Sequence, residues 1–64
     1  MDLDPLARRI RAEFLEMPGL RLSMPQAARL WGLDAPTCDA VVTRLEHDSF
    51  LRRTDGGIVT RVDR

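Results

Sequence analysis

A single glycine, Gly32, separates two short segments that each carry a helical pattern of apolar residues. Ser23, followed three residues later by Gln26, forms a capping box that predicts a helix starting near Met24. Gly32 ends that helix, because glycine takes a left-handed backbone conformation without strain, and apolar Leu33 follows it. The sequence therefore predicts two helices that meet at a tight corner.

The segment after this corner is a second amphipathic helix, from about Ala35 to Asp48, with Asp34 as its cap. At about 100° per residue, one narrow arc of this helix is apolar and faces the core; it holds Cys38, Val41, Val42 and Leu45. The other side has no large apolar group; it carries Pro36, Asp39, Ala40, Thr43 and His47, with Thr37 and Arg44 on its flank. We expect that side to be exposed.

Further elements lie on both sides of this helix pair. Asp4 as cap and Pro5 at the first helical position predict an earlier helix, whose apolar side carries Leu6, Ile10, Phe14 and Met17. The alternation over residues 20–23 fits one short strand. At the C-terminal end, the Asp55-Gly56 turn, backed by Gly57, predicts a hairpin with strands at 50–54 and 58–62.

The composition sets limits on the function. The 64 residues form one domain, 1–64, and ten arginines balance ten acidic residues. Zero net charge is unusual for a protein that binds phosphates, although residues 49–64 carry four arginines and two aspartates. The only cysteine has no partner for an internal disulfide, and the chain has neither a signal-peptide pattern nor a long apolar run. We therefore expect a cytoplasmic protein outside the membrane.

This order of elements, from about Asp4 to Val62, resembles a winged helix-turn-helix domain, a mainly helical α+β fold of three helices with a short strand and a hairpin wing. The most specific stretch is "QAARLWGLDAPTCDAVV", in which Ala28 and Gly32 match the small residue and the turn glycine of the motif. Close approach of the two helices requires a small residue at Ala28, and we expect the corner to pack Leu30, Trp31 and Leu33 against the first helix. The family often has glycine before the Phe-Leu pair. Here Ser49 stands there, so either the turn differs or Ser49 adopts a less comfortable conformation.

The resemblance implies a function in DNA binding. In this family the second motif helix enters the major groove and the preceding helix lies across the backbone. Carried over by position, the base-facing residues are Pro36, Thr37, Asp39, Ala40, Thr43 and Arg44. The expected phosphate-facing residues are Ser23 and Gln26 at a helix start and Arg52, Arg53 and Arg61 on the hairpin. The resemblance thus implies a small bacterial duplex-DNA-binding protein, a transcriptional regulator or a recombination accessory factor.

The alternative is a protein-interaction module with the same fold, which the neutral charge and the acids Asp34, Asp39 and Glu46 favour. A DNA-binding domain this small also needs tandem sites, a homodimer or a protein partner for tight binding. Enzymatic activity is not expected, because His47 and Cys38 lie on opposite sides of one helix and no Cys/His cluster exists. The sequence indicates no cofactor, no metal and no small-molecule ligand.

Overall fold

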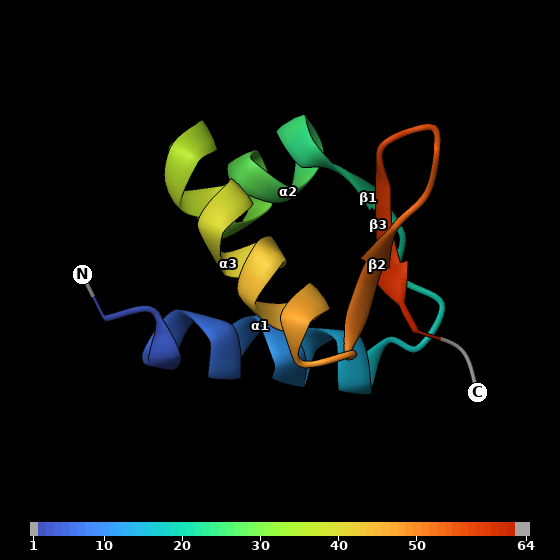
Figure 1. The fold of residues 1–64 in the computed structure, drawn as a ribbon, viewed down its shortest axis with the longest axis horizontal. Helices are drawn as coiled ribbons and strands as arrows, with labels where there is room; N and C mark the ends of the chain where they lie inside the picture. Colours follow the sequence, from blue (N-terminus) through green and yellow to red (C-terminus); the bar gives the residue numbers. More distant parts are fainter. Residues whose placement is uncertain (1, 63–64) are drawn as a thin grey trace.

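The computed structural model describes residues 2–62, which form three helices and one small antiparallel sheet (Figure 1). In chain order these are α1 (Asp4–Glu16), β1 (Leu22–Ser23), α2 (Met24–Trp31), α3 (Ala35–His47), β2 (Leu51–Arg53) and β3 (Ile58–Arg61). The strand order is β1-β3-β2, so β3 is the central strand. This confirms the expected mainly helical α+β class, with a short strand after the first helix and a C-terminal hairpin.

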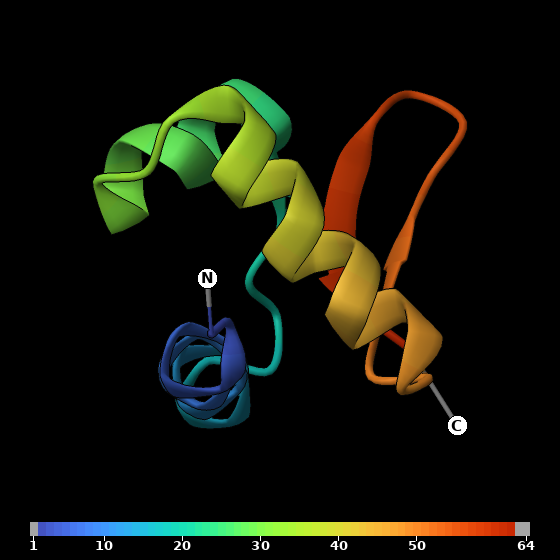
Figure 2. The same ribbon diagram turned by 60° about the vertical axis from the view of Figure 1, so that its left-hand side comes forward.

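The helices and the hairpin occupy different parts of the molecule. In Figures 1 and 2, α1 lies on one side, α2 and α3 lie together across from it, and the β2–β3 loop extends away from the helices. Among residues 2–62, no helix has the length and apolar character needed to cross a membrane.

Helix α1 differs from the expectation in its cap and in the position of Met17. Its preceding residue is Leu3, and the Asp4 N–H donates to the Asp2 carboxylate at 3.1 Å, so the prediction that Asp4 is the cap was wrong. Met17 lies outside the helix and is 49% exposed. Pro18 ends the helix here, because the residue before a proline disfavours the helical conformation. Ala7, which the sequence pattern did not select, is buried.

The predicted corner between α2 and α3 is confirmed. The Gln26 N–H donates to the Ser23 hydroxyl at 3.2 Å, and the Ser23 N–H donates to the Gln26 side-chain carbonyl at 2.9 Å. At the other end, Gly32 has φ of +67°, and the Leu33 N–H donates to the Ala28 carbonyl at 2.9 Å. This left-handed closure is what turns the chain from one helix into the next.

The start of α3 is also as expected. The Asp34 carboxylate accepts a hydrogen bond from the Thr37 N–H at 3.4 Å, which caps the helix. Hydrogen bonding from the Thr37 side chain, and to a smaller extent from the Thr37 N–H, lowers the pKa of the Asp34 carboxyl, because it favours the charged form.

Removing the α2 cap gives a first test of this corner. We expect Ser23→Ala to lower the free energy of unfolding by about 1 kcal/mol, because the Gln26 N–H loses its acceptor. Urea unfolding followed by circular dichroism measures the change. Ser23→Thr keeps a hydroxyl and is expected to stay close to the original protein, so equal losses in the two variants would contradict the capping role.

The core is built from all three helices and the hairpin. Its buried members are Ala7, Ile10, Phe14, Ala27, Trp31, Cys38, Val41, Val42, Leu45, Leu51 and Val59. Phe14 and Trp31 meet edge to face, with ring centroids 6.2 Å apart. This arrangement confirms the predicted inward side of α3 and the expected buried position of Trp31.

Two expectations about α2 need correction. Leu30 is 52% exposed, so the prediction that it packs against α1 was wrong, whereas Trp31 and Leu33 do contact the core. Ala27 and Trp31 are one turn apart and define the buried face of α2. Leu30, the neighbour of Trp31, is turned by about 100° from it and therefore lies on the flank of that face. The fully buried small residue is Ala27, and Ala28 is only partly buried.

The end of α3 settles the question about Ser49. Ser49 has φ of +60°, the less comfortable of the two conformations considered from the sequence. Its N–H donates to the Glu46 carbonyl, and the Phe50 N–H donates to the Leu45 carbonyl, both at 2.9 Å. Helix α2 ends with the same pair of hydrogen bonds around Gly32. A serine therefore occupies a position that usually belongs to glycine, at a cost of about 1 kcal/mol.

Candidate nucleic-acid interface

The outward side of α3 is accessible over its N-terminal half. Pro36, Asp39 and Thr43 are exposed, and Thr37 and Ala40 are half-buried. None of these side chains is a large apolar group, and no neighbouring element covers them completely. The structure therefore leaves a small, polar helix surface, as predicted for the expected base-facing residues.

Arg53 faces this helix. Its Nη1 atom donates to the Asp39 carboxylate at 2.8 Å, its Nε atom donates to Glu46 at 2.9 Å, and its Nη2 atom donates to the Thr43 hydroxyl at 2.9 Å. We call these four residues the Arg53 cluster. Burial alone lowers the pKa of Arg53, but Asp39 and Glu46 outweigh it and raise the pKa.

The Arg53 cluster changes how the expected contacts are arranged. Arg53 was expected to face phosphate, and Asp39 and Thr43 were expected to face bases, yet in the structure they bind one another. The network ties strand β2 to helix α3. Contact of any of these residues with DNA stays a prediction.

Arg44 is also held by carboxylates. It lies 2.8 Å from Asp4 in α1 and 3.7 Å from Asp48, one turn further along α3. These contacts direct its guanidinium toward α1. The sequence could suggest the Asp48 pair from its spacing, but the Asp4 pair depends on the packing of α1 against α3.

Ser23 and Gln26 lie at the start of α2, where they were expected to meet phosphate. Their side chains bond each other's backbone in the capping box. Gln26 is exposed and Ser23 is half-buried. The capping role is thus confirmed, and the phosphate role stays a prediction.

Arg52 and Arg61, the other two expected phosphate contacts, lie apart from the Arg53 cluster. Neighbouring residues in a strand point to opposite faces of the sheet, so Arg52 points away from the face of Arg53. Arg61 places its guanidinium carbon 5.5 Å from the ring centre of Phe50, and Arg11 of α1 lies 4.7 Å from the same ring centre. The three hairpin arginines therefore do not form one surface.

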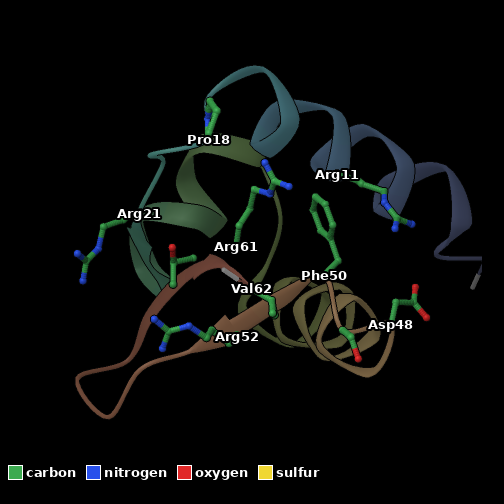
Figure 3. A pocket seen from close by; sticks show the side chains of 10 residues that line it. Arg11, Pro18, Arg21, Asp48, Phe50, Arg52, Arg61 and Val62 are labelled. Carbon is green, nitrogen blue, oxygen red and sulfur yellow. The ribbon is translucent and has the colours of Figure 1, made fainter. Parts of the chain in front are cut away.

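Arg52 and Arg61 instead line a pocket of about 640 Å³ at the end of the sheet nearest α1 (Figure 3). Arg11 and Arg21 line it too, together with Phe50 and Asp48. We call it the arginine pocket. The sequence assigned no role to Arg11 or Arg21. The alternation of apolar and polar residues over 20–23 places Arg21 on the polar side of a short strand, but its neighbours become known only with the strand order of the sheet.

Charge is separated across the molecule. The arginine pocket and a smaller adjoining hollow share Arg11 and Asp48. Together these two hollows are lined by six arginines and two aspartates, Arg8, Arg11, Arg21, Arg44, Arg52 and Arg61 with Asp4 and Asp48. By contrast, Asp34, Asp39, Glu46 and Asp55 lie along α3 and the hairpin turn with Arg53. The two hollows thus carry an excess of arginines over acids, although the chain as a whole has zero net charge.

The remaining candidates for chemistry are isolated. Cys38 is fully buried, and this burial raises the pKa of its thiol, so it is a poor nucleophile. His47 is exposed at the end of α3. Within residues 2–62, no three His, Cys, Asp or Glu side chains are grouped to hold a metal ion.

Comparison of the chain with protein-family models, with curated proteins and with solved structures gives no match.

Proposed function

We propose that this protein is a small winged helix-turn-helix protein that binds duplex DNA, with α3 in the major groove and the hairpin on the backbone. The observation that carries the proposal is the outward side of α3 from Pro36 to Thr43, which is small, polar and accessible. Arg53 fixes the hairpin beside that side. In this role it acts as a bacterial regulator or a recombination accessory factor in the cytoplasm.

The charges around α3 set the conditions for binding. Duplex DNA brings a dense row of phosphates, and Asp39 is 59% exposed on the proposed contact surface. Arg53 has to exchange its carboxylate partners for phosphate before it contributes to binding. We therefore expect weak binding that decreases steeply as salt increases.

Removal of the Asp39 charge tests this interface directly. Asp39→Asn removes one repulsive charge and loosens the hold on Arg53, so we expect duplex affinity to increase about fivefold at low salt. Fluorescence anisotropy with a labelled mixed-sequence duplex measures the dissociation constant. Glu16→Gln makes the same charge change on the exposed end of α1 and serves as the matched control.

The two variants distinguish DNA binding through α3 from binding elsewhere on the protein. An increase with Asp39→Asn and no change with Glu16→Gln supports contact through α3. Equal changes in both variants, or no duplex binding at about 100 μM protein, overturn the proposal, since non-specific affinities usually lie within that range.

A second candidate function is protein interaction through the same surface. The acids along α3 and the hairpin turn favour it, because a partner with a basic surface complements them. An NMR titration in which an arginine-rich peptide shifts the amides of residues 35–47, while duplex DNA shifts none, supports this alternative.

A further inference from the structure

We propose that the arginine pocket is a binding site for phosphate groups, separate from the α3 surface. One arginine from each of four segments lines the pocket: Arg11 from α1, Arg21 from the residue before β1, Arg52 from β2 and Arg61 from β3. Figure 3 shows Arg11 and Arg61 beside Phe50, with Arg21 and Arg52 on the side of Arg61 away from the ring. This site goes beyond the proposed function and does not depend on it.

The four arginines of the pocket have no carboxylate partner in the part of the chain that the structure describes. Within residues 2–62, no ion pair or side-chain hydrogen bond involves Arg11, Arg21, Arg52 or Arg61. Arg44 and Arg53, in contrast, each have two carboxylate partners. The chain has as many acids as arginines, so this gathering of unpaired cations is a property of the fold and not of the composition.

Asp48, the one acid among the described residues that line the pocket, already has a partner. Asp48 lies 3.7 Å from Arg44, which offsets its charge. Like charges that line one pocket repel each other, and an anion with several oxygens relieves that repulsion. The electrostatics of the pocket therefore favour a ligand of high negative charge.

Phe50 holds part of the site in place. Its ring carries Arg11 at 4.7 Å and Arg61 at 5.5 Å, both within the range of a cation–π contact. Because this contact restricts two long side chains before a ligand arrives, less entropy is lost on binding. The planar guanidinium group also matches the geometry of phosphate oxygens, with two parallel N–H donors.

The volume of about 640 Å³ is within the usual range of small-ligand pockets, and it exceeds what a single inorganic ion fills. The four positive charges fit at least two adjacent phosphates. Those phosphates can belong to a small molecule, such as a nucleoside diphosphate, or to a nucleic-acid backbone; the shared chemistry is the phosphate group.

Titration with pyrophosphate, followed by ¹H–¹⁵N NMR, tests the site. We expect shifts at the Arg11 and Arg61 side-chain Nε–H groups and at the amides of residues 49–53 and 60–62. The double variant Arg11→Gln, Arg61→Gln is expected to weaken the affinity at least about tenfold, since each lost guanidinium removes a charge-assisted contact.

Arg9→Gln is the matched control. Arg9 is exposed on α1 outside the pocket, and Arg9→Gln makes the same charge change as the single variant Arg11→Gln, which is expected to weaken pyrophosphate binding by itself. Retained spectra and retained melting temperatures show that each variant is folded. Equal losses in Arg9→Gln and Arg11→Gln overturn the proposal. So does an absence of localised shifts at about 10 mM pyrophosphate, which nearly saturates even a millimolar site.

A comparison of ligands identifies the source of the phosphates. If adenosine diphosphate binds as tightly as a thymidine oligonucleotide of about 12 residues, the site fits a small phosphorylated ligand. An oligonucleotide that binds much more tightly, with the same dependence on Arg11 and Arg61, indicates a nucleic-acid backbone. Asp39→Asn is expected to leave pyrophosphate binding unchanged, which separates this site from the α3 surface.

Discussion

Phe14→Ala is expected to leave the protein largely unfolded at 25 °C. Phe14 has no exposed surface and packs edge to face against Trp31, with ring centroids 6.2 Å apart. Truncation of a buried phenylalanine costs about 3–5 kcal/mol. A chain of this size has a total stability of only about 3–5 kcal/mol, so the loss is comparable to the whole. Circular dichroism and the dispersion of an amide NMR spectrum measure the outcome.

Leu15→Ala is the control for this prediction. Leu15 is the next residue of α1 but is 53% exposed, and alanine is a good helix former. We expect its stability to change by no more than about 0.5 kcal/mol. If Phe14→Ala still unfolds cooperatively with a loss below about 1 kcal/mol, the core is not centred on the contact between α1 and α2.

The features that the sequence predicted well depend on residues close together in the chain. The Ser23–Gln26 capping box and the left-handed Gly32 each involve only one helical turn. The inward side of α3 follows from one periodicity, and Cys38 and Leu45 are buried as that periodicity requires. Local signals of this kind do not depend on how distant elements pack.

The features that the sequence did not predict depend on distant elements. Arg44 meets Asp4 only because α1 packs against α3. The strand pattern could predict which face of the sheet carries Arg53, because Arg53 is two residues from buried Leu51 and such residues share a face. The identity of its partners Asp39 and Glu46 was not available, because it depends on how the hairpin sits beside α3.

The arginine pocket shows the same limit for charge. Arg52 lies on β2 and Arg21 directly precedes β1, and β3 lies between these two strands, so only the sheet order brings the two arginines to one pocket. The net charge of zero does not reveal that these arginines lie apart from the acidic residues along α3. Charge counted along the chain located a basic C-terminal segment, but it did not show that Arg52 and Arg53 point to opposite faces of the sheet.

Arg53→Met is expected to lower the free energy of unfolding by about 2 kcal/mol. This value lies between the cost of breaking an exposed ion pair and the cost of breaking a buried one. Methionine keeps most of the apolar stem but removes every donor. Asp39 and Glu46, which approach Arg53 at 2.8 Å and 2.9 Å, are then left as two nearby carboxylates without a cation. Thermal and urea unfolding measure the loss.

Two further variants separate charge from packing. Arg52→Met removes a neighbouring arginine that has no ion-pair partner among residues 2–62, so we expect a change within about 0.5 kcal/mol. Adding Asp39→Asn and Glu46→Gln to Arg53→Met removes the stranded carboxylates and is expected to restore about half of the lost stability, because their mutual repulsion disappears. If Arg53→Met and Arg52→Met behave alike, the Arg53 cluster does not hold the hairpin against α3, and the position of the hairpin beside the surface proposed to bind DNA then depends on the buried side chains Leu51 and Val59 alone.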